Sequence, residues 1–420
     1  MLFLLTASGR VNSLDFLTFS KHITMKALLL AFFVFISHLA SLKAQTSPIL
    51  QSQLIFPLQE KHVHASSIVS LPNQDLLAVW FEGSGERTAN DVLLMGARLK
   101  VGSLNWSKPF VMADTPNLPD CNPVLFLNGE GKLFLVWIAV QANRWEQSIL
   151  RVKIATDFES DGPPRWSWQD NIFLNPGDEF SEEVVRRFQE LPKNTAGWAE
   201  YAPSYDRMIL EAAQDPKKRT TGWMTRIKPL VLETGKIILP LYSDGYNFSM
   251  MAISEDHGKT WTPSLPLVGR GPIQPALIQK KDGTLAAYLR DSGDAPGRVQ
   301  YSESKNEGYT WTASQKTTIP NTASVEVLKL KDGRWAFVGN DQSDGRYRLS
   351  IYLSDDEGQT WKWKFPVENH EPSSGSYSYP SLIQSEDGLL HLTYSYHLSS
   401  TQKSIKHVVV NPQLIPVWID

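Results

Sequence analysis

The sequence contains a single cysteine, Cys121, among its 420 residues. One thiol cannot form an intrachain disulfide, and it excludes a cysteine-rich zinc or iron–sulfur site. An excess of charge is also lacking, because 41 Lys and Arg stand against 44 Asp and Glu, for a formal net charge of -3. No basic run interrupts this balance, so we expect no nucleic-acid partner. Without a glycine-rich dinucleotide motif or a phosphate loop, we expect no cofactor.

Long hydrophobic runs are scarce, and the one that stands out lies near the N-terminus. Residues 25–44 read MKALLLAFFVFISHLASLKA, in which Lys26 precedes an apolar run over residues 27–36. That run is short for a membrane helix and typical of a signal peptide. We therefore expect Met25 to be the initiator, residues 1–24 not to be translated, and the mature protein to be exported to the periplasm or the medium without a membrane span.

Tryptophan, glycine and proline are abundant, with 14, 26 and 26 copies. The pattern Ser-x-Asp/Asn-x-Gly-x-Thr-Trp occurs at residues 254–261, 304–311 and 354–361, at a constant spacing of 50 residues. The Asp or Asn side chain can bond the backbone N–H groups of its own turn, and Gly supplies a positive φ. Each copy therefore predicts a hairpin turn with a structural role.

A second pattern, two apolar strands joined by a glycine turn, recurs in six units that start near residues 64, 122, 228, 274, 324 and 379. Units of about 40–50 residues with four strands are typical of β-propeller blades. The last unit is one strand short, and residues 49–56 can supply that strand and close the ring. We expect one all-β domain, a six-bladed β-propeller over residues 45–420. Residues 170–225 form a partly helical insertion between blades two and three, expected to fold over the rim of a site.

The repeated turn Ser-x-Asp/Asn-x-Gly-x-Thr-Trp is called an Asp box. Asp boxes on a six-bladed propeller make the chain resemble the sialidase (neuraminidase) superfamily of BNR-repeat proteins, over nearly all of residues 45–420. In such a propeller the first strand of each blade begins at the mouth of the central funnel. That position lies nine residues before the turn glycine, or seven in the third unit. The count selects one position in each unit: the neighbourhood of His64, Asn122, Lys228 with Arg226 just upstream, Gln274, Ser324 and Tyr379.

The resemblance also implies roles for particular residues. Sialidases hold a sugar carboxylate with three arginines and use a tyrosine nucleophile, which a glutamate activates, and an aspartate as acid and base. Tyr379 stands at the position of the nucleophile, and Asp91 at that of the acid and base. Arg290 and Arg346 stand at the second and third arginines.

Two positions depart from that pattern. His64 replaces the first arginine and is a further catalytic candidate, and Gln274 replaces the activating glutamate. Glutamine cannot accept a proton, so Tyr379 would lack its usual base. Three glutamates could replace it, and their positions in the fold are not set by the sequence: Glu86, Glu182 and Glu200.

The leading hypothesis is a monomeric, sialidase-like exo-glycosidase that acts on a terminal acidic sugar, a sialic acid or a uronate. Tyr379, Asp91 and His64 would be catalytic, and the substrate-binding residues would be Arg290, Arg346, Arg226, Lys228, Gln274 and Asn122.

Two alternatives stay open. A polysaccharide lyase or unusual glycosidase would use His64 and Tyr379 as base and acid at a uronate. A non-catalytic glycan-binding propeller would leave the tyrosine as a packed strand residue and the arginines as salt-bridge partners. The pair His62-x-His64 is too weak a signal to predict a metal.

Overall fold

Short strands and tight turns fold residues 48–418 into six four-stranded antiparallel sheets. The computed structural model describes residues 47–192 and 202–418. The predicted signal peptide and the segment before it lie outside these residues, so export stays a prediction. Within the described ranges, none of the helices has the length and apolar character that crossing a membrane requires.

Each sheet is one blade, and the blades follow one another along the chain. Blade one contains β2 (His62–Ser70), β3 (Leu76–Gly83), β4 (Leu93–Leu99) and β5 (Phe110–Ala113). Blade two contains β6 (Asp120–Leu127), β7 (Leu133–Val140), β8 (Ser148–Asp157) and β9 (Arg165–Asn171). Blade three contains β10 (Leu230–Val231), β11 (Ile237–Ser243), β12 (Phe248–Ser254) and β13 (Thr262–Pro263). Blade four contains β14 (Pro272–Gln279), β15 (Leu285–Asp291), β16 (Arg298–Ser304) and β17 (Gln315–Pro320). Blade five contains β18 (Glu326–Lys329), β19 (Trp335–Gly339), β20 (Arg348–Ser354) and β21 (Trp363–Asn369). Blade six contains β22 (Ser376–Gln384), β23 (Leu390–His397), β24 (Lys403–Val410) and β1 (Ile49–Leu54).

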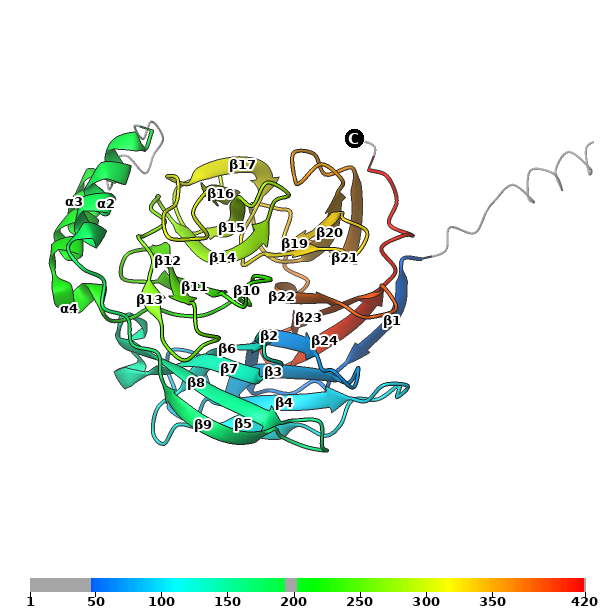
Figure 1. The fold of residues 1–420 in the computed structure, drawn as a ribbon. Coiled ribbons are helices and arrows are strands. Elements are labelled where there is room, and N and C mark those ends of the chain that lie inside the picture. Colours follow the sequence, from blue (N-terminus) through cyan, green and yellow to red (C-terminus); the bar gives the residue numbers. More distant parts are fainter. Residues whose placement is uncertain (1–46, 193–201, 419–420) are drawn as a thin grey trace, which may run out of the picture. The chain divides into compact units, whose positions relative to one another are not determined.

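The six sheets surround a central axis, with the first strand of each blade nearest to it (Figure 1). The ring is closed as the sequence predicts, because β1 pairs antiparallel with β24, from Ile49 opposite Val410 to Leu54 opposite Lys406. This pairing covers the free edge of the last blade with the start of the domain. The predicted six-bladed propeller is confirmed.

The three Asp boxes connect the third and fourth strands of blades three, four and five, and their hydrogen bonds are those of the predicted turn. In the first box the backbone N–H groups of Lys259 and Thr260 donate to Asp256 Oδ1 at 3.0 and 2.9 Å. In the second box the indole of Trp311 donates to the carbonyl of Gly308 at 2.9 Å and is buried beneath the turn. These turns lie at the end of the ring opposite the funnel mouth, because the first strand of each blade starts at the mouth and the strands alternate in direction.

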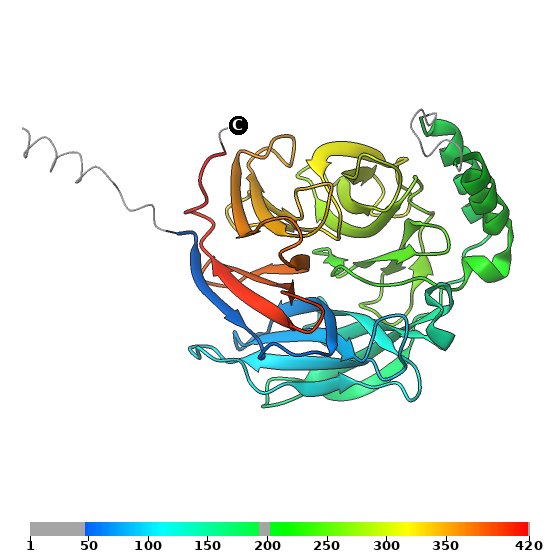
Figure 2. The same ribbon diagram turned by 180° about the vertical axis from the view of Figure 1, so that it is seen from behind.

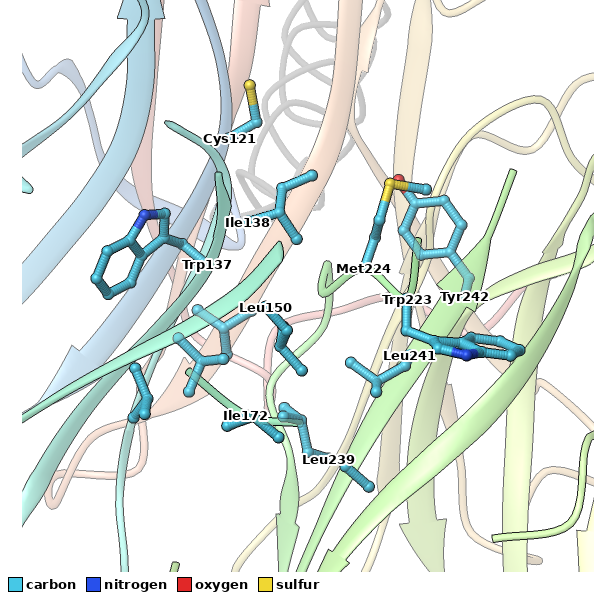
Figure 3. Packing of buried hydrophobic residues seen from close by; sticks show 14 of the residues in the cluster. Cys121, Trp137, Ile138, Leu150, Ile172, Trp223, Met224, Leu239, Leu241 and Tyr242 are labelled. Atoms are coloured by element: carbon cyan, nitrogen blue, oxygen red, sulfur yellow. The ribbon is translucent and has the colours of Figure 1, made fainter. Parts of the chain in front are cut away.

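Blades two and three pack through buried aliphatic side chains, which give this part of the ring its core. Figure 3 shows Leu150 and Ile172 facing Leu239, with Trp137 and Trp223 on either side. All of these side chains belong to the largest buried cluster in the described part of the chain. Burying one such aliphatic side chain contributes roughly 1.5–3 kcal/mol, so this contact fixes the two blades relative to each other.

The predicted helical insertion is present between blades two and three. It contains α2 (Glu179–Glu190), α3 (Ala202–Gln214) and α4 (Pro216–Arg219). These helices lie along the outer edge of the ring beside blade three (Figures 1 and 2). Phe180 packs against Tyr246, with ring centroids 5.4 Å apart, and Arg270 pairs with Asp206 at 2.8 Å. The described helices contact the rim loops from outside the ring, so the expectation that the insertion folds over the funnel rim stays a prediction that these helices do not support.

Candidate active site

The first strand bulges at the funnel mouth in blades one, two, four and six, where its register with the second strand shifts. A residue other than glycine takes a positive φ at each bulge: Ala65 at 53°, Asn122 at 50°, Gln274 at 55° and Tyr379 at 60°. Such a backbone costs of order 1–3 kcal/mol per residue and gathers at functional sites. A bulge also redirects the side chain, so the fold directs three polar side chains toward the mouth.

These side chains meet in a cavity of about 330 Å³ at the mouth. Five of the six blades contribute to its lining, although the contributing residues are far apart in the sequence. The lining residues are Glu86, Arg87, Asn122, Trp145, Tyr242, Asp244, Asn247, Ile273, Gln274, Arg290, Ser292 and Tyr379. The structure therefore brings Tyr379, Arg290, Gln274 and Asn122 of the predicted set into one pocket.

The phenol of Tyr379 is surrounded by cationic side chains. Arg290 Nη1 donates to its oxygen at 2.9 Å, and Gln274 Nε2 donates at 3.4 Å. The guanidinium groups of Arg226 and Arg346 lie 4.8 and 5.4 Å from the centre of its ring. Burial alone raises the pKa of Tyr379, but the charges of Arg290 and Arg346 outweigh burial and leave the pKa below its usual value. The phenol is therefore easier to deprotonate than an ordinary buried tyrosine.

His64 packs directly on this tyrosine, with ring centroids 4.1 Å apart. The rings of His62 and His397 lie 5.7 and 5.6 Å from His64. Burial, and then the neighbouring His397 and Arg346, hold the pKa of His64 well below its usual value, so the imidazole is neutral at neutral pH. A neutral ring thus stands where the resemblance implies a permanently charged arginine.

Among the glutamates that could serve Tyr379, Glu86 is the one that lines the pocket. Its Oε2 lies 3.2 Å from His62 Nε2. Glu182 is exposed on α2, and Glu200 lies outside the described residues. The negative charge of Glu86 acts to raise the pKa of Tyr379, so the two groups interact electrostatically.

Asp91, the predicted acid and base, is exposed and does not belong to the pocket lining. Its carboxylate accepts from the backbone N–H of Ser84 at 2.9 Å and from the hydroxyl of the same serine. These hydrogen bonds lower the pKa of Asp91, which makes it a poorer proton donor at neutral pH. Its catalytic role stays a prediction that this geometry does not support.

The structure places Arg226 and Lys228 inside the ring and outside the pocket lining, so their role in substrate binding stays a prediction that this geometry does not support. Arg226 Nη2 donates to the carbonyl of Pro380 at 3.1 Å, and burial lowers the pKa of its guanidinium to about 10. The Lys228 ammonium donates to the carbonyl of Leu382 and lies 3.8 Å from Glu326. Both cations are therefore held by the protein itself rather than presented to a ligand.

Arg346 is half-buried and touches the site through the tyrosine ring rather than through the pocket lining. Burial lowers its pKa, and its charge acts on Tyr379 together with that of Arg290. Of the two arginines that the resemblance assigns to a carboxylate, Arg290 lines the pocket and Arg346 supports the phenol.

Sequence reasoning missed a set of contacts that joins loops of different blades across the pocket. Arg87, from the turn after β3, stacks on the Trp145 ring at 4.0 Å and pairs with Asp244 at 2.8 Å. This contact links blade one to blade three over a tryptophan of blade two. The three residues lie in loops without periodicity, so no pattern in the sequence indicates them.

Tyr242 was also missed, although the repeat contains a signal for it. Its hydroxyl accepts from Asn122 Nδ2 at 3.0 Å in the pocket. Tyr242 stands seven residues after the turn glycine Gly235, as Arg290 stands seven residues after Gly283. The second strand of each blade returns to the mouth, so a forward count from the turn would have found both residues.

The comparison with known families agrees with this architecture. A family model described as a BNR repeat-like domain matches residues 74–392. The chain belongs to this family. A search of curated proteins finds no match.

The solved structures similar to this BNR-repeat propeller include sialidases. The leech intramolecular trans-sialidase, complexed with 2,7-anhydro-Neu5Ac, is 13% identical, with 87% of this chain and 71% of that chain covered and a TM-score of 0.64. The intramolecular trans-sialidase from Ruminococcus gnavus is 14% identical, with 85% and 96% covered and a TM-score of 0.62. A protein of unknown function from Dyadobacter fermentans is 14% identical, with 86% and 98% covered and a TM-score of 0.63. At such identities the likeness shows the fold alone.

In and beside the pocket of the BNR-repeat propeller, three buried polar atoms have no hydrogen-bond partner among the described residues. Gln274 Oε1 and Arg290 Nε belong to residues that line the pocket, and His64 Nδ1 belongs to the ring that packs on Tyr379. Each unsatisfied buried polar group costs about 1–3 kcal/mol of stability. In the described part of the chain, no group of three or more His, Cys, Asp or Glu side chains is placed to hold a metal ion.

Proposed function

We propose that the protein is a retaining exo-glycosidase that removes a terminal acidic sugar from a glycan, with Tyr379 as nucleophile. The observation that carries the proposal is the position of the phenol, 2.9 Å from Arg290 Nη1 and with a lowered pKa. A tyrosine suits an anionic substrate, whose carboxylate would repel an aspartate or glutamate nucleophile. Sialidases are an exception to the usual pair of carboxylates for this reason.

In the first step the Tyr379 oxygen bonds to the anomeric carbon while the bond from that carbon to the leaving oxygen breaks. As this bond forms, the phenolic proton passes to solvent water, a loss that the arginines favour, and a carboxylic acid protonates the leaving oxygen. In the second step water attacks the anomeric carbon and gives a proton to the resulting carboxylate, and the phenolate that leaves takes up a proton from solvent. Glu86 is our choice for the acid and base, because it lines the pocket whereas Asp91 does not.

Arg290 binds the carboxylate of the sugar in this proposal, since a guanidinium can donate two parallel hydrogen bonds to it. Arg346 adds positive charge behind the tyrosine ring. His64 is neutral, so the pocket holds less positive charge than three arginines would supply. A uronate therefore stands beside a sialic acid as a candidate sugar.

The test is chemical trapping together with product analysis. A fluorinated, activated glycoside of the acidic sugar should form a covalent adduct on the peptide that contains Tyr379, detected by mass spectrometry. Aryl glycosides of sialic, glucuronic and galacturonic acid should release product with retained anomeric configuration, measured by NMR. An inverted product, or turnover without an adduct on Tyr379, would contradict the mechanism.

A lyase acting on a uronate is the second candidate, because a neutral His64 packs 4.1 Å from the easily deprotonated tyrosine and has an unpartnered Nδ1. One of the two residues would abstract the proton next to the carboxylate, and the other would protonate the leaving oxygen. The product would then be an unsaturated uronate with new ultraviolet absorbance, whereas a hydrolase releases reducing sugar without it. Binding with neither product would indicate a non-catalytic propeller.

A further inference from the structure

A second and larger cavity lies at the mouth end of blade two, beside the pocket that contains Tyr379. Its volume is about 690 Å³, against about 330 Å³ for the first. It is built from the connection between β7 and β8, the segment that follows β9, and the end of the insertion. The residues that decide its character are Gln147, Asn171, Phe173, Lys217, Lys218 and Thr220.

The charges in this second cavity are of one sign. Lys217 and Lys218, on α4, are its charged lining residues, and the lining contains no Asp or Glu. Neither ammonium forms an ion pair with any residue that the structure describes. Two free cations beside a cavity favour an anionic ligand.

The remaining lining combines an apolar platform with hydrogen-bonding groups. The ring of Phe173 is 74% exposed, although a large aromatic side chain is ordinarily covered. The floor contains Leu150, Ile172 and Trp223, which belong to the core between blades two and three (Figure 3). Amides and hydroxyls surround this floor. Sugar rings need such a mixture, because they present apolar C–H faces and many hydroxyls.

The two cavities share a wall, the 3-10 helix η2 (Trp145–Gln147). Trp145 lines the first cavity and Gln147 lines the second. These residues are about 4 Å apart along the helix axis at the usual 3-10 rise. The end of the insertion is fitted closely to this wall, because a Cβ on Gly222 would lie 2.4 Å from the carbonyl oxygen of Glu146. Neighbouring sugars of one chain can therefore occupy both cavities.

We propose that the second cavity is a subsite for the continuing part of an acidic oligosaccharide whose terminal sugar lies at Tyr379. Lys217 and Lys218 bind its carboxylates, and Phe173 stacks on a sugar face. The proposal rests on the proposed function in one respect, the assignment of the terminal acidic sugar to the first pocket. It names the substrate class as a chain with repeated acidic sugars rather than a neutral glycan with one acidic end.

Binding without turnover tests this directly. In a Tyr379→Phe background, calorimetric titration with galacturonate and sialate chains of one to six sugars should show affinity rising at least tenfold from the monomer to the longer chains. The double variant Lys217→Ala/Lys218→Ala should lose that gain, as should Phe173→Ala in part, while the affinity for the monosaccharide stays unchanged. A matched control, Lys259→Ala/Lys305→Ala, removes two exposed lysines from the Asp-box end and should behave as the parent.

Three outcomes would overturn the subsite: affinity independent of chain length, equal affinity for neutral chains, or a length effect that survives loss of both lysines. Hydrolysis is measured separately on the parent protein. If acidic chains bind in a lysine-dependent manner but no sugar is released, the subsite stands and the proposed reaction fails. If aryl glycosides are hydrolysed but longer acidic chains bind no better than the monosaccharide, the reaction stands and the subsite fails.

Discussion

The Asp-box end and the funnel mouth are built from the same blades, but one end repeats a single pattern and the other does not. At the Asp-box end, three turns repeat one pattern in which the Asp or Asn side chain accepts from its own turn, as in the hydrogen bonds of Thr260 to Asp256 and of Thr360 to Asp356. At the mouth, equivalent positions carry Asn122, Gln274 and Tyr379, each with a positive φ. Several buried polar atoms there lack a partner within the described residues. Repetition thus marks the end that stabilises the ring, and divergence marks the end where we propose that the chemistry takes place.

This contrast predicts that substitutions at the two ends separate activity from stability. A mouth residue should affect turnover with little change in the free energy of unfolding. An Asp-box residue should do the reverse. Strain and unsatisfied polarity at the mouth are costs that the ordered turns and cores of the blades offset elsewhere.

The largest effect is expected for Tyr379→Phe. The ring and its packing on His64 remain, and the reacting oxygen is lost, so kcat on an acidic aryl glycoside should fall at least about 1,000-fold, or ~4 kcal/mol. Tyr377→Phe is the control, because it removes a buried hydroxyl from the same strand that binds only the carbonyl of Ser374, at 3.4 Å. Comparable losses in both variants would mean that the effect belongs to the strand and not to the nucleophile.

Trp311→Ala should have the largest effect at the other end. The indole is 1% exposed and seals the second Asp box, so its removal leaves a cavity and should cost about 3–5 kcal/mol of unfolding free energy. Urea unfolding followed by fluorescence or circular dichroism measures this. Turnover per folded molecule should stay within about twofold of the parent. A large loss of kcat at full folding would break the separation between the ends.

The sequence predicts the ring of blades well, because each repeat is set by interactions between residues that are close in the sequence. Glycine turns and Asp boxes recur at fixed spacing, so blade number, closure by residues 49–56 and the start of most first strands follow from counting. The same count finds Asn122, Gln274 and Tyr379. The count succeeds in blades that repeat the same backbone, where the number of residues between the start of the first strand and the turn glycine is constant.

The other residues of the site could not be found by counting, because they lie in loops or because their role depends on how deep in the funnel the side chain lies. Glu86 and Arg87 lie in a turn with no counterpart in other blades. Arg226 lies just upstream of the position that the count selects in the third unit, yet its guanidinium donates to main-chain carbonyls of Ser66 and Pro380. Whether a cation faces a ligand or the protein is settled by packing between distant segments, which no single repeat contains.

Arg290→Lys should have an intermediate effect at the mouth. Charge is kept, but a guanidinium that binds both the phenol and a carboxylate becomes a single point contact, so kcat/KM should fall about 10- to 100-fold, or ~1.4–2.7 kcal/mol. Arg298→Lys, on β16 of the same blade, alters a cation that donates to the carbonyl of Thr318 away from the pocket. If the two variants lose activity equally, the carboxylate clamp at Arg290 is contradicted.

The smallest effect is expected at the first Asp box, and it depends on pH. Burial acts to raise the pKa of Asp256, but hydrogen bonds from Thr260 and its neighbours outweigh burial and lower it from 3.8 to about 2. A carboxyl group with a lowered folded-state pKa stabilises the fold above its unfolded pKa and loses that contribution as the pH falls from about 4 to about 2.

Asparagine is a natural replacement at this position, because Asn306 accepts from the N–H and hydroxyl of Thr310 at 3.0 and 3.1 Å in the second box. At pH 7 we therefore expect Asp256→Asn to cost less than about 1 kcal/mol and Asp256→Ala about 1–2 kcal/mol. Asparagine does not titrate, so the difference in unfolding free energy between the parent and Asp256→Asn should shrink between pH 4 and pH 2. Urea titrations at several pH values measure this difference. A gap that stays constant with pH would show that the turn depends on hydrogen-bond geometry alone and not on the charge of Asp256.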